Sequence, residues 1–244
     1  MRIGNWELRK QDIAMRTLGY FFLWMGYSLY SLSGLGVYAP TCMDFAMLDG
    51  KNDVRLDVAV LPISLGLRST VSYGLTDHVL IQADAKYHDN QYYGQLVSGW
   101  YSNADSRVLE VLGGASVGYG NDRLHDMESW HSGNYITCFL QGNMGWKNLA
   151  NKHIDVAFGA RCGYYYASLI NSAFFGNTVK EEDVVAHSFF VEPNINFRFG
   201  WEKLKFNLKT GYNFHHVSAL CPSKGAHTGM GDFVSMELSL NYHF

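Results

Sequence analysis

Apolar and polar residues alternate along most of the chain between Asp53 and Phe244. The last segment shows the pattern most clearly, because every second residue is apolar: Met236, Leu238, Leu240, Tyr242 and Phe244. Successive side chains of a β-strand point to opposite faces, so a period of two predicts a strand with one apolar face. The same alternation recurs along the chain and predicts about ten antiparallel strands. Residues 92–101 are also strand-like, but their pattern leaves it open which face is apolar.

The polar faces of these strands carry isolated charges that nearly balance. Seven are basic and six are acidic: Arg55, Arg68, Lys86, Arg161, Arg198, Lys205 and Lys209 against Asp57, Asp84, Glu110, Asp155, Glu192 and Glu237. Small polar residues and ion pairs of this kind are typical of a narrow barrel lumen. We therefore predict that residues 53–244 form an all-β, transmembrane, antiparallel up-and-down barrel with apolar faces toward lipid. The alternative is a soluble, lipocalin-like carrier barrel whose apolar faces point inward.

The connections between the predicted strands alternate in length. Those at 75–78, 103–106, 147–152 and 200–203 are short, whereas those at 121–131, 172–186 and 218–231 are long and polar. Outer-membrane barrels have short periplasmic turns and longer extracellular loops. The chain is therefore expected to present three long loops to the exterior, with both ends of the barrel sequence on the periplasmic side. Aromatic residues near the short turns, such as Trp146 and Trp201, are expected to form a girdle there.

The N-terminal region has the pattern of an export signal. Residues 18–32 are apolar, basic residues precede them, and small residues such as Ser33 and Gly34 follow. This order predicts residues 1–34 as an N-terminal extension and cleavable signal peptide, and residues 35–52 as a short periplasmic segment. A retained transmembrane helix is the alternative. Leu35 stands where a lipoprotein would carry cysteine, so the mature chain is predicted to be unlipidated.

Composition excludes several classes of function. The net charge is −3, with no basic stripe, so the sequence gives no support for nucleic-acid binding. The four cysteines are scattered and form no CxxC pair, which argues against a zinc or redox site: Cys42, Cys138, Cys162 and Cys221. They are interpreted as small apolar residues, although one disulfide in an oxidising compartment stays open. We expect neither a cofactor nor a metal ion.

The C-terminal segment 236–244 resembles the targeting signal of outer-membrane barrels, which ends in an aromatic residue after alternating apolar positions. The resemblance implies that the chain is recognised by the barrel assembly machinery through Phe244. It also implies residence in the outer membrane, with membrane lipid as the surrounding partner. The sequence does not identify an extracellular partner.

The mature chain also resembles a family of small outer-membrane barrel proteins of Bacteroidota. The resemblance rests on residues 38–41 (YAPT), 50–54 (GKNDV), 113–120 and 189–200 (FFVEPNINFRFG). It implies a barrel of uncertain function. Members often carry a lipoprotein-type signal, and Leu35 departs from that feature.

One short motif suggests catalysis. His216-Val217-Ser218, at the predicted outer end of the ninth strand, resembles the His-x-Ser motif of lipid A deacylases, which are also outer-membrane barrels. The resemblance implies His216 as base and Ser218 as nucleophile of a lipid acyl hydrolase. The family's Asn after the serine is Ala219 here, and the nearest acidic residues are Asp232 and Glu237. Strand alternation places Glu237 on the luminal face, away from His216.

Other polar residues offer weaker hints. Ten-stranded outer-membrane proteases place acidic residues and a histidine at the outer mouth, and similar groups occur here: Asp84, His88, Asp89, His125, Asp126 and His131. His215, His216 and His227 could bind a metal ion, although loop histidines are more often unliganded. The leading expectation is a non-enzymatic outer-membrane barrel with a side-chain-filled lumen and a structural or surface-interaction role.

Overall fold

A computed structural model describes residues 41–61, 66–88, 91–104, 106–121, 129–175, 178–220 and 233–244. Side chains at 129, 151–152, 173–175, 178, 215–220 and 233–234 are not described. The predicted signal peptide, the position of Leu35 and the alternative of a retained helix all lie outside these residues. No helix among the residues that the structure describes is long and apolar enough to cross a membrane.

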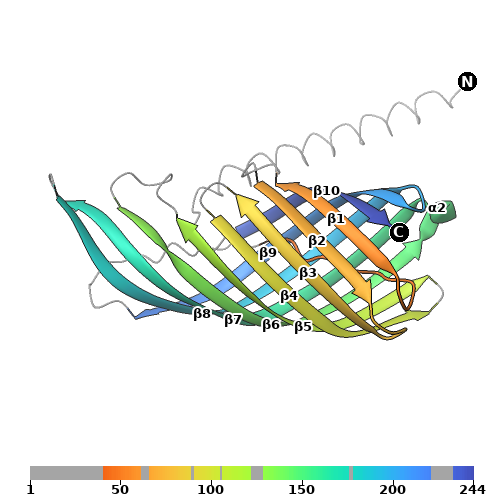
Figure 1. Cartoon of the computed structure of the whole chain (residues 1–244), viewed down its shortest axis with the longest axis horizontal. Helices are drawn as coiled ribbons and strands as arrows, with labels where there is room; N and C mark the ends of the chain where they lie inside the picture. The colour runs from red at the N-terminus through yellow and green to blue at the C-terminus, as the bar shows by residue number, and fades with distance from the viewer. Residues whose placement is uncertain are drawn as a thin grey trace, which may run out of the picture. The chain divides into compact units, whose positions relative to one another are not determined.

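Ten antiparallel strands form one closed barrel, as the alternation predicts, and each strand pairs with its neighbours in sequence (Figure 1). The strands are β1 Val54–Leu61, β2 Gly66–Gly74, β3 Val79–His88, β4 Gln91–Ala104, β5 Arg107–Asn121, β6 Ser129–Asn148, β7 Ile154–Phe175, β8 Thr178–Gly200, β9 Leu204–Leu220 and β10 Phe233–His243. The first and last strands close the barrel, with Val58 of β1 opposite Leu240 of β10. Closure leaves no unpaired strand edge, which a sheet needs in order to cross a bilayer.

The apolar sides of the strands face outward and the charged sides face inward. Lys209 and Glu237 are 0% exposed, whereas Leu238 and Leu240, on the opposite face of β10 from Glu237, are 48% and 45% exposed. A soluble carrier would show the opposite arrangement. Continuous apolar surface of this extent is rare on proteins in water, so the soluble alternative is not favoured.

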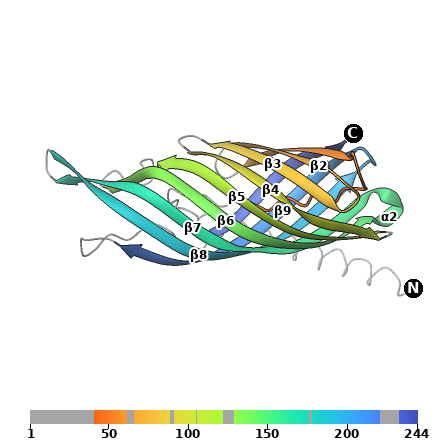
Figure 2. The ribbon, with the colours of Figure 1, turned by 60° about the horizontal axis from the view of Figure 1, so that its bottom comes forward.

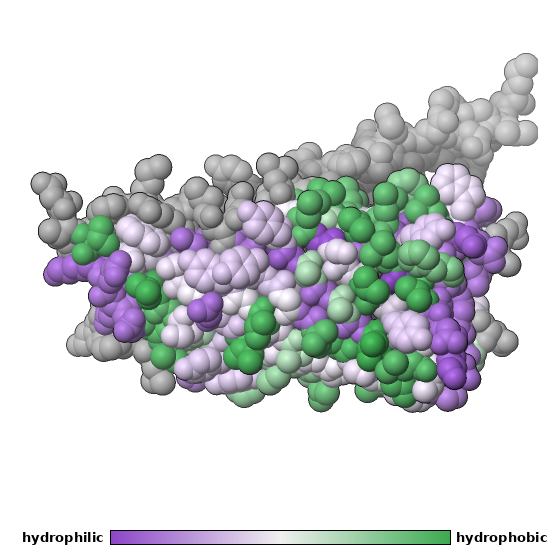
Figure 3. All heavy atoms as spheres, in the orientation of Figure 1, coloured by the Kyte–Doolittle hydropathy of each residue, from purple (hydrophilic) through white to green (hydrophobic). Residues whose placement is uncertain are grey.

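Aromatic residues border the apolar exterior at two levels. Toward the short turns, exposed Trp100, Trp201, Tyr242 and Phe244 form one girdle, and Tyr87, Tyr92 and Tyr166 are exposed near the other end. Eight residues separate Tyr92 from Trp100 on β4, which corresponds to about 26 Å along the strand and about 20 Å across a membrane at a tilt of about 40°. Figure 3 shows apolar residues gathered between a polar rim at the turn end and a paler region beyond.

The short connections lie where the sequence predicts them. They join β2 to β3, β4 to β5, β6 to β7 and β8 to β9 at the end of the barrel that also holds the start of β1 and the end of β10. We call this the turn end, and the opposite end the loop end. A short helix, α2 (Leu149–Lys152), completes the turn between β6 and β7.

One predicted long loop is wrong. Residues 172–186 are not a loop, because β7 and β8 stay paired until Phe175 faces Thr178. The pairs Ile170–Asp183 and Leu169–Val184 belong to this extension. Most of the other two predicted loops, residues 122–128 and 221–232, lies outside the described residues.

The barrel wall is uneven in height at the loop end (Figure 2). Strands β1, β2 and β3 have 8, 9 and 10 residues, whereas β6, β7 and β8 have 20, 22 and 23. We call β6–β9 the tall wall. A tilted strand crosses a membrane with about 9–11 residues, so β8, with 23, is long enough to extend well beyond it.

Candidate functional site

The lumen holds a segment of the chain itself. Residues 41–48, which precede β1, are buried, and polar groups of the segment contact side chains from most of the barrel's strands. The sequence predicts residues 35–52 as a periplasmic segment; residues 41–48 instead lie buried inside the barrel. The physical reason is that an inward-facing polar wall needs partners, and the backbone of this segment supplies them.

Arg68 and Glu237 bind the segment at Cys42. The Cys42 backbone N–H donates to Glu237 Oε1 at 2.9 Å, and Arg68 Nη1 donates to the Cys42 carbonyl at 2.5 Å. Arg68 also donates to Glu237 Oε2 at 2.8 Å and to both oxygens of Asp84. Tyr93 donates to the same carboxylate of Asp84, at 2.8 Å, and its hydroxyl lies 3.1 Å from Thr41 Oγ1. The segment is thereby tied to β2, β3, β4 and β10.

Asp44 is the charged residue at the centre of the segment. Lys209 Nζ donates to Asp44 Oδ1 at 2.8 Å and to Asp57 Oδ1 at 2.7 Å. Gln141 Nε2 donates to the Asp44 carbonyl at 3.1 Å, and Gln82 Nε2 donates to its carboxylate at 3.3 Å. A buried charge is tolerated only when it is paired and hydrogen-bonded in this way.

The rest of the segment is held by β5, β6 and β8. The Met47 N–H donates to Glu110 Oε1 at 2.6 Å, and Lys147 Nζ donates to the Leu48 carbonyl at 3.1 Å. The Phe45 carbonyl accepts a hydrogen bond from Arg198. Gly145 leaves room for Met47, because a Cβ there would lie 2.8 Å from Met47 Cε.

All thirteen luminal charges predicted from the alternation are buried. The sequence counts seven basic residues against six acidic ones, and Asp44 of the segment is a seventh buried carboxylate. Several form direct pairs, including Arg68 with Asp84, Lys205 with Asp155 at 2.6 Å and Arg161 with Glu192 at 3.5 Å. Lys147, which the strand pattern does not count, is an eighth buried cation, so the segment supplies one carboxylate to a lumen whose charges nearly balance.

A second group of charges lies at the turn end. Asp49, Asp53 and His243 place three ligand-type atoms within 4.8 Å of one another, the one such group among the described residues. Asp49 already has two cationic partners, Lys147 at 2.5 Å and Arg55 at 3.4 Å. Burial alone would raise the pKa of Asp49, but the hydrogen bond and charge of Lys147 and the charge of Arg55 hold it below its usual range. We interpret the group as an ion-pair network that joins the start of β1 to the end of β10, rather than as a metal site.

Above the charged layer, the inner face of the tall wall becomes apolar. Tyr135, Phe139, Tyr165, Leu169, Val184 and Phe190 are buried in one cluster. The inner face changes from charged to apolar at Arg161 and Phe139, where the guanidinium lies 4.3 Å from the centroid of the ring. This cation–π contact separates the ion pairs from the aromatic cluster.

The structure does not assemble a hydrolase site from the residues that it describes. In the register of β8 and β9, His216 is opposite Phe189 and Ser218 is opposite His187, but the side chains at 215–220 lie outside the description. Glu237 is buried in the lumen and bound to Arg68 and Cys42, so it is not available to orient a base. Asp232 also lies outside the described residues.

The described residues also do not bring together the candidates for a protease-like site or a metal site. Asp84 is buried and fully engaged by Arg68 and Tyr93. His88 is buried at the end of β3, and His131 lies within β6. Asp89, His125, Asp126 and His227 lie outside the description, as does the side chain of His215. Of the described cysteines, Cys42, Cys138 and Cys162 are free thiols.

A closed barrel with an apolar exterior, two aromatic girdles and an ion-paired lumen defines a transmembrane β-barrel. No protein-family model and no curated protein sequence matches the chain.

Several solved structures of outer-membrane proteins are similar in fold. The outer-membrane protease OmpT from Escherichia coli aligns with 80% of this chain and 94% of its own, at 9% identity and a TM-score of 0.45. A major outer membrane protein from Thermus thermophilus covers 78% and 99%, at 13% identity and a TM-score of 0.42. The KdgM porin covers 79% and 99%, at 11% identity and a TM-score of 0.36. At these scores, the assignment rests on the exterior and lumen of this molecule.

Proposed function

We propose that this protein is a non-enzymatic barrel of the outer membrane, with a closed lumen and a structural or surface-interaction role. The observation that carries the proposal is the segment 41–48, which is hydrogen-bonded to the inner wall and occupies the space that a solute would need. A ten-stranded barrel whose interior is filled by side chains and by this segment is suited to a structural role rather than to transport.

The tall wall is the part of the barrel suited to surface interaction. Strands β7 and β8 continue as a paired ribbon past the level of the outer girdle, and Val179, Glu181 and Asp183 are exposed on it. With the turn end in the periplasm, this ribbon lies outside the cell. The sequence motifs shared with the small Bacteroidota barrels support the same location, and Phe244, exposed at the end of the chain, suits recognition by the barrel assembly machinery.

Cysteine labelling in intact cells tests this orientation. In a background with the native cysteines replaced by serine, Val179→Cys should react with a membrane-impermeant maleimide. Lys203→Cys, exposed in the turn between β8 and β9, is the matched control and should react only after the outer membrane is opened. Labelling of Lys203→Cys but not Val179→Cys in intact cells would refute the orientation.

The proposed lack of enzymatic activity has its own test. The purified barrel should release no acyl chains from lipid A, and Ser218→Ala should behave as the unmodified protein does. Acyl release that disappears in Ser218→Ala would replace the structural role with the hydrolase role.

A further inference from the structure

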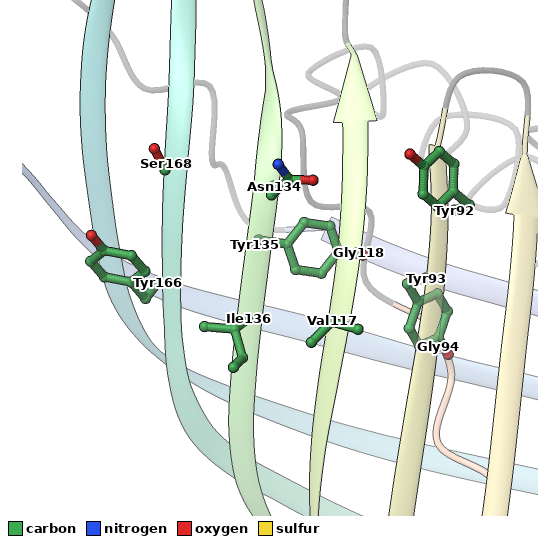
Figure 4. Close-up of a pocket in the computed structure, with 10 residues that line it drawn as sticks. All are labelled: Tyr92, Tyr93, Gly94, Val117, Gly118, Asn134, Tyr135, Ile136, Tyr166 and Ser168. Carbon is green, nitrogen blue, oxygen red and sulfur yellow. The ribbon is translucent and has the colours of Figure 1, made fainter.

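The outer surface of the barrel carries a hollow of about 520 Å³ across β4, β5, β6 and β7. Figure 4 shows Tyr92 and Tyr166 on its two sides, with Val117 and Ile136 between them. The register places Gly94, Val117, Ile136 and Tyr166 in one row across the four strands. Val117, Ile136 and Tyr166 are exposed, so the row faces away from the lumen.

Gly94 opens the hollow on the outer surface. A Cβ at Gly94 would meet no atom within 4 Å, so the absence of a side chain there leaves open space between Tyr92 and Val117. Gly118 faces the lumen, where a Cβ would lie 2.8 Å from Tyr135 Cε1 because the ring packs over the glycine. Gly118 therefore makes room for the Tyr135 ring on the luminal side, and on the outer side it contributes backbone alone, as any inward-facing residue does.

The residues that line the hollow indicate which class of ligand fits it. None of the ten described residues that line the hollow is charged, so nothing in it compensates a phosphate. Val117, Ile136 and the tyrosine rings offer apolar walls, whereas the exposed side chains of Asn134 and Ser168 offer hydrogen-bond donors at one end. This combination suits a hydrocarbon chain that begins at an ester or amide carbonyl.

The position of the hollow points to the same ligand. Tyr92 and Tyr166 belong to the outer girdle, and the exposed side chains of Leu96 and Leu140 continue the surface toward the middle of the membrane. The hollow is thus continuous with the lipid-facing exterior, with its polar end nearer the loop end. We propose that it is a binding site for one acyl chain of a bilayer lipid, whose carbonyl group is bound by Asn134 and Ser168. The inference rests on the proposed membrane location.

Photocrosslinking tests the site in lipid vesicles that contain the whole protein and a phosphatidylethanolamine with a diazirine on its palmitoyl chain. Label should concentrate at Val117 and Ile136, several-fold above Val58 and Ile195, which are exposed elsewhere on the barrel. Gly94→Phe should fill the hollow and remove this excess. Gly142→Phe is the matched control, because Gly142 also has open space around it but lies outside the hollow, and it should keep the excess.

The outcomes separate this inference from the proposed function. Equal labelling at all four positions would leave the membrane barrel intact and overturn the binding site. If the protein forms dimers that exclude label from the hollow, the hollow is a contact with a second copy of the chain, and the proposed lipid site is wrong. Gly94→Phe and Gly142→Phe could both lose the excess labelling at Val117 and Ile136. The loss would then not depend on filling the hollow, and this result would also contradict a defined site. An absence of labelling anywhere on the protein would contradict the membrane location itself.

Discussion

The inner face of the tall wall differs between its turn-end and loop-end halves. Near the turn end it carries Glu192, Arg198 and their neighbours, which bind the segment 41–48 or pair with one another. Near the loop end the same face is lined by Tyr165, Val184 and Phe190, while Glu181 and Asp183 face outward. Polarity is therefore reversed along a single strand, because the outer surface contacts lipid in one half and water in the other.

We call the turn-end half of the barrel the lower half and the loop-end half the upper half. Removing a charge from the lumen of the lower half should have the largest effect on stability. Arg68→Met leaves Asp84 and Glu237 buried without their main cation, and should lower the free energy of unfolding by about 3–5 kcal/mol. Arg107→Met, the same change at an exposed position near the turn end, should change it little. Urea unfolding in lipid vesicles measures both variants, and equal stabilities would contradict the role of the luminal pairs.

A charge added to the outer face distinguishes the two halves directly. Leu96 is 71% exposed and lies midway between the two girdles on β4, so Leu96→Arg should cost about 2–4 kcal/mol at the middle of the bilayer. Val179→Arg, on the outer face of the upper half, should cost less than about 0.5 kcal/mol because water surrounds it. The same unfolding measurement compares them, and a similar cost at both positions would place both in the same solvent.

The boundary between the halves can be weakened at Phe139. Phe139→Leu removes the ring over Arg161 and leaves a small cavity, with an expected loss of about 2 kcal/mol. Phe189→Leu is the control, since Phe189 is exposed on the outer face and fills no cavity. If Phe189→Leu proves the more destabilising variant, the packing at the boundary contributes less than we infer.

The smallest expected effect concerns pH at the turn end. The pKa of Asp49 is lowered in the folded barrel from 3.8, so its stabilising contribution is complete above about that pH and is lost as the pH falls through the lower folded value. Unfolding stability should therefore fall slightly more steeply with acid in the unmodified protein than in Asp49→Asn. Identical pH profiles would mean that the Asp49 network with Lys147 adds nothing to stability.

Alternation predicts the lower half of the barrel well, for a physical reason. A membrane barrel sets lipid against one face of each strand and a closed lumen against the other, so period-two sequences such as 204–209 and 236–244 have only one compatible orientation. The ambiguous residues 92–101 are explained by Tyr93, Val97 and Tyr101, which are buried on the inner face although apolar residues also cover the outer one.

The sequence predicts the upper half less well. Residues 180–183, Lys-Glu-Glu-Asp, have the composition of a loop, and their polarity no longer follows the pattern set by lipid. Pairing with residues 170–173 of β7, the other arm of the same hairpin, nevertheless keeps them in a strand. The polarity of these residues does not show this, because the hairpin is held by backbone pairing between its two arms and not by the side chains of one arm.

The segment in the lumen was also missed by alternation, since residues 41–48 have no regular period. One signal could have found it: the predicted lumen has seven basic but only six acidic residues, and Asp44 is a carboxylate within an otherwise apolar run. A buried charge requires a partner, so a lone carboxylate in an apolar run is a candidate partner for the luminal cations. The hydrolase candidates His216 and Ser218 stay a prediction, because their side chains lie outside the described residues.

Single-channel recording in planar bilayers tests the closed lumen most directly. The account predicts no stable currents from the unmodified protein, and new currents from a variant that lacks residues 41–48 and still shows the heat-modifiable mobility of a folded barrel. Large, stable currents from the unmodified protein would contradict it, because they would require an open path where the structure places the segment and its ion pairs.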